Sequence, residues 1–97
     1  MAAKYVFSIR AIEESNAAYN WYFDISKKLA DRFILELETT IGQVTERPLS
    51  FRKVHKEFRQ SKLRSFPCLV VFEVIEGVVI VQTIFHTSRN PKKKFRK

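Results

Sequence analysis

The 97-residue sequence contains one cysteine, and none of its apolar runs approaches the length of a membrane span. Cys68 has no second cysteine with which to form an internal disulfide, so a reducing compartment is expected. A membrane-spanning helix needs about 18 consecutive apolar residues, so we expect no membrane association. Residues 1–10 lack the apolar core and small-residue cleavage site of a secretory signal. These absences predict a cytoplasmic protein.

Metal-binding patterns are also missing. The soft or borderline ligands are His55, Cys68 and His86, and they stand at no recognised metal-site spacing. We therefore expect neither a metal nor a cofactor. Apolar residues make up 45% of the chain and include nine phenylalanines, which excludes a disordered chain and predicts one folded domain.

Acidic residues are scarce in the second half of the chain. Residues 1–51 hold six Lys or Arg and seven Asp or Glu, whereas residues 52–97 hold twelve and three, so the net charge of +8 arises entirely in the second half. A concentration of positive charge attracts a partner of the opposite sign. We expect nucleic acid, a ribosome or an acidic protein segment as that partner. The alternative is a basic surface that serves only solubility.

The first half of the chain predicts a short strand followed by a helix. Tyr5, Phe7 and Ile9 alternate with Val6, Ser8 and Arg10, which is the period of a strand. Residues 11–26 predict a helix, because apolar residues recur at spacings of three and four. The apolar stripe of this helix is Ala18, Tyr22, Ile25 and Leu29.

A second helix is predicted over residues 27–47, with Ser26 as its N-cap and Pro48 as its stop. Its apolar stripe is Ala30, Phe33, Leu37, Ile41 and Val44. The short connection predicts that the two helices pack as an antiparallel hairpin. The aromatic run of residues 21–23 is interpreted as core rather than as a binding box, and neither helix is expected to carry a functional site.

Residues 59–91 predict an antiparallel sheet. Glu76 and Gly77 suit a two-residue hairpin turn, and this turn pairs Ile75 with Val78. Alternation then separates two surfaces. We expect the helices to cover the surface formed by Cys68, Val70, Phe72, Val74, Val79, Val81, Thr83 and Phe85. The outer surface is expected to hold Lys62, Arg64, Glu73, Gln82 and His86. In the preceding strand, Arg64 is expected opposite Leu69.

The predicted fold is α+β, in the order β-α-α-β-β-β. An N-terminal strand and an antiparallel helix hairpin precede a three-stranded antiparallel meander, and the helices pack on one face of the twisted sheet. Residues 1–91 are expected to form the single domain. Residues 92–97 are expected to form a basic tail.

Four pieces of this sequence, in this order and spacing, resemble the RelE/ParE-type toxins of bacterial type II toxin-antitoxin systems. The pieces are Trp21-Tyr22, Phe33 with Glu36-Leu37 before Pro48, Leu63-Arg64-Ser65-Phe66-Pro67, and the His-x-x-Arg-x-Pro text within Ile84–Pro91. The resemblance covers most of the chain. It implies a cytoplasmic toxin that inhibits growth, stabilises a plasmid and is neutralised by a cognate antitoxin whose extended or helical C-terminal segment wraps it.

The resemblance leaves two activities open, because RelE-like members cut messenger RNA on the ribosome and ParE-like members poison DNA gyrase. RNA cleavage needs a proton carrier and stabilisation of charge on the phosphate. His86 suits the first task, and Arg64 and Arg89 suit the second, so these three are the candidate catalytic residues. His86 and Arg89 are equally well interpreted as scaffold residues that close a strand.

One departure favours the ParE-like branch. RelE-like enzymes carry a tyrosine near the C-terminus, but no tyrosine follows Tyr22 here, and Phe95 can stack on a base without transferring a proton. We therefore expect gyrase as the target. The alternatives are a metal-independent, ribosome-dependent endoribonuclease and a non-toxic member that binds nucleic acid or an acidic partner. Candidate residues for binding the target or nucleic acid are Lys53, Lys56, Arg59, Lys62, Lys92, Lys93, Lys94, Phe95 and Arg96.

Overall fold

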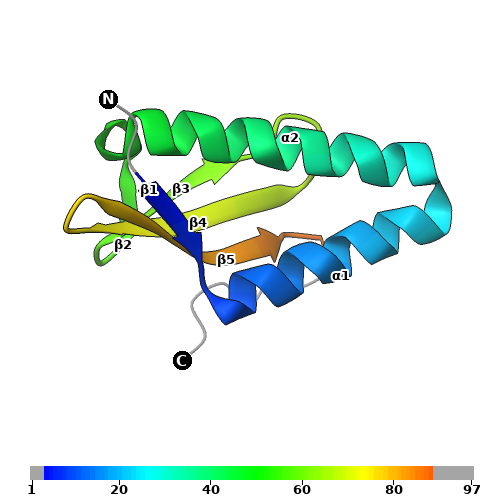
Figure 1. Ribbon diagram of the computed structural model, residues 1–97, viewed down its shortest axis with the longest axis horizontal. Coiled ribbons are helices and arrows are strands. Elements are labelled where there is room, and N and C mark those ends of the chain that lie inside the picture. Colours follow the sequence, from blue (N-terminus) through cyan, green and yellow to red (C-terminus); the bar gives the residue numbers. More distant parts are fainter. Residues whose placement is uncertain (1–3, 89–97) are drawn as a thin grey trace.

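Two long helices lie against one face of a five-stranded sheet in the computed structural model, which describes residues 4–88 (Figure 1). The helices are α1 (Ile9–Ile25) and α2 (Lys27–Glu46), followed by the 3₁₀ turn η1 (Pro48–Ser50). The strands are β1 (Lys4–Phe7), β2 (Lys53–His55), β3 (Phe58–Lys62), β4 (Cys68–Ile75) and β5 (Val78–His86). Neither long helix has the length and hydropathy needed to cross a membrane. The predicted α+β class and element order are confirmed, with β2 as an additional short strand.

The sheet is mixed rather than purely antiparallel. Its strand order is β1-β5-β4-β3-β2, and β1 runs parallel to β5. The other neighbouring strands pair antiparallel, as the predicted meander requires. After α1 and α2 the chain enters the sheet at β2, the edge opposite β1, and the antiparallel meander then brings β5 beside β1 in a parallel orientation.

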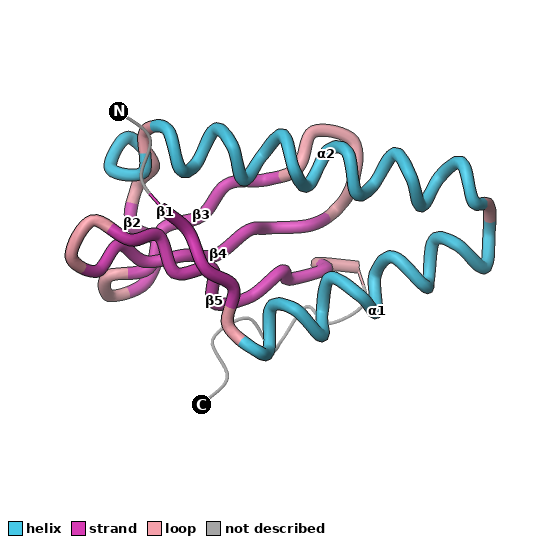
Figure 2. The backbone as a smooth tube through the Cα atoms, in the orientation of Figure 1, coloured by secondary structure: helices cyan, strands magenta, loops and turns pink. Residues whose placement is uncertain are grey.

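Two serines set the ends of the helix hairpin. Ser8 caps α1 by accepting a hydrogen bond from the Ala11 amide at 3.0 Å, so α1 begins two residues earlier than predicted. Ser26 is the single residue between the helices and accepts from the Leu29 amide at 3.3 Å. The predicted N-cap is thereby confirmed, and the two helices run in opposite directions and spread apart from the tip toward the sheet (Figure 2).

The predicted core is confirmed for α2 but only in part for α1. All five residues of the α2 stripe are buried, whereas on α1 the buried residues are Ala11, Ala18 and Tyr22. Ile25 is 63% exposed and Trp21 is 48% exposed, so their assignment to the core is wrong. The reason is length: at about 1.5 Å per residue, helices of 17 and 20 residues span roughly 25–30 Å, and the hairpin tip extends past the strands (Figure 1).

The β4–β5 hairpin follows the predicted register only as far as a bulge. Glu76 and Gly77 have φ angles of 50° and 77°, which suit a tight two-residue turn, and pairing continues from Ile75–Val78 to Phe72–Val81. Gln82 is then an extra residue, because Val71 pairs with Thr83 and not with Gln82 as predicted. The later pairs are therefore shifted by one position.

The bulge exchanges the faces of the residues at the end of β5. Cys68 pairs with His86 and Val70 with Ile84, so His86 and Ile84 take the helix-facing positions that were predicted for Phe85 and Thr83. Ile84 accordingly belongs to the main core cluster, and His86 is only 8% exposed. The predicted position of His86 on the outer surface is wrong.

The register between β3 and β4 differs from the prediction by two residues. Lys62 pairs with Leu69, so Arg64 falls in the loop after β3 instead of opposite Leu69. A shift of two preserves the face of every side chain. Leu63 is accordingly buried, while Arg64 lies beside α2.

Where β1 ends, Ser8 and the first turns of α1 take its place as the hydrogen-bonding partner of β5. The Ser8 amide donates to the Val81 carbonyl at 2.9 Å, and the Ser8 hydroxyl donates to the Gln82 carbonyl at 2.9 Å. One carboxylate oxygen of Glu14 then accepts from the Thr83 hydroxyl at 2.5 Å and from the Ile84 amide at 3.0 Å. These bonds satisfy β5 backbone groups that would otherwise lack a strand partner.

Glu14→Ala should lower the free energy of unfolding by about 2 kcal/mol, because it removes two bonds to a charged acceptor at the edge of β5. Glu13→Ala removes an exposed carboxylate from the adjacent position and should change stability by less than about 0.5 kcal/mol. Urea unfolding of both variants measures the difference. Equal stabilities would show that Glu14 does not hold the edge of β5.

Candidate functional site: a cationic groove beside the second helix

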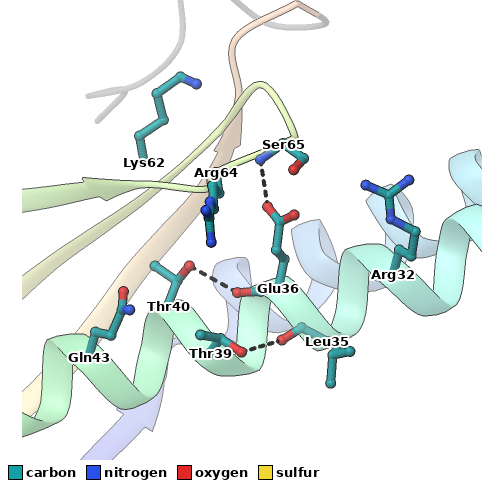
Figure 3. Close-up of a pocket in the computed structure, with 9 residues that line it drawn as sticks. All are labelled: Arg32, Leu35, Glu36, Thr39, Thr40, Gln43, Lys62, Arg64 and Ser65. Atoms are coloured by element: carbon teal, nitrogen blue, oxygen red, sulfur yellow. Dashed lines mark hydrogen bonds between the residues drawn. The ribbon is translucent and has the colours of Figure 1, made fainter.

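A groove runs between one face of α2 and the end of β3 (Figure 3). Its volume is about 700 Å³. The residues that line it are Arg32, Leu35, Glu36, Thr39, Thr40, Gln43, Lys62, Arg64 and Ser65. The six residues from α2 recur at spacings of three and four, which places them on one side of the helix. The described residues that line the groove include three cationic side chains, Arg32, Lys62 and Arg64, and one carboxylate, Glu36.

Glu36 connects α2 to the loop that follows β3. Its carboxylate accepts a hydrogen bond from the Ser65 amide at 2.7 Å. Burial by itself raises the pKa of the Glu36 carboxyl, but bonds from Ser65 and from the Arg64 backbone, with the charge of Arg32, outweigh it and leave the pKa below its ordinary value of 4.5. The ionised carboxylate thus holds the loop, and Arg64 within it, against α2.

Arg64 is the exposed cation at the centre of the groove. Its guanidinium points toward α2, near Thr40, and makes no hydrogen bond or ion pair with residues 4–88 (Figure 3). Arg32 lies at one end of the groove, with its guanidinium carbon 6.0 Å from the centre of the Phe66 ring. Lys62 points away from α2 at the rim, with its ammonium 3.5 Å from the Leu63 carbonyl.

The structure separates His86 from this groove. The Nε2 atom of His86 lies 2.8 Å from the Tyr22 hydroxyl, and the side chain packs among core residues below α1. His86 does not line the groove that contains Arg64. Of the three candidate catalytic residues, His86 is therefore buried and Arg64 is exposed. The third, Arg89, lies outside the described residues.

The candidate binding residues within residues 4–88 lie in two places, the β2–β3 hairpin and the rim of the groove. Lys53, Lys56 and Arg59 belong to the β2–β3 hairpin, where Lys53 pairs with Glu57 at 3.0 Å and Arg59 donates to the Phe51 carbonyl at 2.6 Å. Of the four binding candidates that lie within residues 4–88, Lys62 alone lines the groove. The tail candidates Lys92, Lys93, Lys94, Phe95 and Arg96 lie outside the described residues.

Sequence reasoning missed the α2 side of the groove. Arg32, Glu36 and Gln43 stand at spacings of four and seven on the polar side of α2, and this spacing was the available signal. A polar helix side is ordinarily solvated, so the spacing alone carried no function. What makes it a site is the loop of residues 63–67, which lies twenty or more positions away in the sequence. No cluster of three potential metal ligands occurs within residues 4–88.

Glu36→Gln should lower the free energy of unfolding by roughly 1 kcal/mol at neutral pH, because a neutral amide accepts the Ser65 amide bond more weakly. Because the folded pKa is lowered, the stabilisation is complete above pH 4.5 and is lost as the pH falls through the lowered value. Urea unfolding at neutral and acid pH should therefore show a difference that shrinks in acid. Glu38→Gln, an exposed position on the same helix, is the control. A difference that grew in acid would contradict the assignment.

Tyr22→Phe should destabilise the fold by about 1–2 kcal/mol, because it removes the buried bond to His86. Tyr19→Phe removes a hydroxyl from the same helix whose contact with Asp31, at 3.5 Å, is exposed to solvent, so it should be close to neutral. Thermal unfolding of the two variants compares them directly. If Tyr22→Phe is also neutral, the bond does not hold β5 to α1.

Comparisons with known proteins agree with this architecture. A family model described as the ParE toxin of the type II toxin-antitoxin system parDE matches residues 5–91. No curated protein matches the sequence. A solved structure, the chromosomal ParDE toxin-antitoxin system from P. aeruginosa, superposes with a TM-score of 0.78 at 13% identity, covering 88% of this chain and 96% of that chain, which shows a shared fold. Because the family match spans nearly the whole chain, this protein belongs to the ParE toxin family of type II toxin-antitoxin systems.

Proposed function

We propose that this chain is a growth-inhibiting toxin that binds DNA gyrase in the cytoplasm and is neutralised by a cognate antitoxin. The observation that carries the proposal is the ParE family match over residues 5–91. The charge distribution is consistent with it, since the positive excess of the second half suits partners that carry acidic segments or DNA. Inhibition is then a matter of binding, and it needs no catalytic group.

The surroundings of His86 favour gyrase binding over RNA cleavage. Metal-independent cleavage of RNA needs a proton carrier and phosphate-binding cations around one accessible phosphate. His86 is 8% exposed and bonded to Tyr22, while Arg64 lies in a groove that His86 does not line. The sequence also lacks any tyrosine after Tyr22 that could act as a second proton carrier. His86 and Arg64 therefore do not form one accessible site for acid–base catalysis.

Purified full-length chain should inhibit DNA supercoiling by gyrase in a dose-dependent way. The physical reason is that the fraction of enzyme occupied by a tightly binding inhibitor rises with the inhibitor's concentration, so inhibition should increase with dose and saturate as the chain reaches molar excess. A supercoiling assay on relaxed plasmid measures this. The matched control is an unrelated protein of similar size and net charge in the same buffer. Full supercoiling at a large molar excess of folded chain would contradict gyrase as the target.

Two further measurements separate the alternatives. Translating ribosomes incubated with the chain should yield intact messenger RNA, and cuts in the ribosomal A site would replace the gyrase proposal with endoribonuclease activity.

Induction of the chain in a host that lacks its antitoxin should arrest growth. Co-expression of the protein encoded by the adjacent reading frame should restore it. Normal growth at good expression would instead indicate a non-toxic binding protein.

A further inference from the structure

We propose that the cationic groove between α2 and the loop of residues 63–67 is a docking site for an acidic peptide segment, with Arg64 as the central contact. The inference deepens the antitoxin half of the proposed function and rests on it for the identity of the partner. The groove itself indicates the chemistry of the occupant, which is a peptide that carries carboxylates on either side of an apolar side chain.

Arg64 supplies the main attraction. Its guanidinium is exposed, makes no ion pair with the described residues and lies in the groove beside Thr40 and Gln43 (Figure 3). A planar guanidinium binds a carboxylate through two parallel hydrogen bonds, which gives both strength and orientation. The Gln43 amide also has no hydrogen-bond partner among residues 4–88, so it can donate to the same peptide or accept from its backbone.

The loop that carries Arg64 is already held in place. Leu63 and Phe66, on either side of it, are buried. The Leu63 amide donates to the Cys68 carbonyl at 3.0 Å, and the Ser65 amide donates to the Glu36 carboxylate at 2.7 Å. Little backbone freedom is therefore lost when a ligand binds, which raises affinity.

The length of the groove fits an elongated occupant. Arg32 and Gln43 mark its ends on α2, and at 1.5 Å per residue they lie about 16 Å apart along the helix. That distance matches about three turns of helix or about five extended residues. A segment with one carboxylate near Arg32 and another near Arg64 would satisfy both cations. Leu35, which is 65% exposed in the lining, would contact an apolar side chain between them.

The lining favours peptide over nucleic acid. Single-stranded nucleic acid binds where cationic side chains alternate with exposed aromatic rings on which bases stack. Among residues 4–88, no aromatic side chain lines the groove, and the ring of Phe66 beneath Arg32 is buried. The carboxylate of Glu36 also lies within the groove, where it repels a continuous row of phosphates but leaves room for separated carboxylates.

Chemical-shift mapping of the isotope-labelled full chain tests the proposal. The probe is a capped peptide of about 15 residues built from Glu-Glu-Leu repeats, long enough for about four helical turns. The controls are the matching Gln-Gln-Leu peptide and a single-stranded oligothymidylate. The Glu peptide should shift the amide signals of residues 32–43 and 62–65 and leave those of the β2–β3 hairpin unchanged. The Gln peptide should shift none of them.

Arg64→Gln should weaken binding of the Glu peptide about fivefold to tenfold, because it removes one charge-assisted pair. Arg52→Gln makes the same change at an exposed position outside the groove and should weaken it less than about twofold. Unfolding temperatures of both variants should equal that of the parent chain, since both side chains are exposed.

Three results would overturn the docking site: no binding of the Glu peptide, shifts that map to another surface, or equal affinity of the Arg64 and Arg52 variants. Equal shifts caused by oligothymidylate in the same amides would replace peptide with nucleic acid as the occupant. The outcome is independent of the gyrase assay. A chain that binds the peptide in the groove but neither inhibits gyrase nor arrests growth keeps the docking site and loses the antitoxin as its partner.

Discussion

The fold depends on a cluster of four rings that meet between the two helices and the sheet. Tyr22 from α1 contacts Phe33 from α2 and Phe66 from the loop after β3, with ring centres 5.3 and 4.9 Å apart. Phe33 and Phe66 are 5.5 Å apart, and His86 at the end of β5 completes the group by its bond to Tyr22. Edge-to-face and tilted packing at these distances adds to the hydrophobic burial of each ring. Four separate elements are thereby held by one cluster.

The same cluster determines the shape of the cationic groove. Phe66 is buried on the core side of the loop, so the neighbouring residues Arg64 and Ser65 are turned outward beside α2. Arg32 lies above the Phe66 ring, and Glu36, one turn further along α2, holds the Ser65 amide. The positions of the exposed charges are therefore consequences of apolar packing beneath them. This explains how a short loop without regular structure presents a guanidinium in a defined place.

Local patterns predicted the elements well, and they failed where a distant segment decided the outcome. The α2 stripe, the Ser26 cap and the Glu76-Gly77 turn all follow from spacing or backbone preference within a few residues, and all are confirmed. The bulge at Gln82 has no such local signal, because bulges arise from pairing between two strands. It reversed the face of His86. The groove was missed for the same reason, since its two walls are far apart in the sequence.

The positions of the four rings explain why the resemblance identified the family but not the target. Each of the four sequence pieces that carried the resemblance contributes one ring: Tyr22, Phe33, Phe66 and His86. What those pieces share in this chain is therefore a packing arrangement, and one packing arrangement can support different activities. Surface side chains outside the cluster, such as Gln43 and the guanidinium of Arg64, can differ at little cost to the fold. Partner choice within such a fold is accordingly expected to depend on side chains that a family motif does not include.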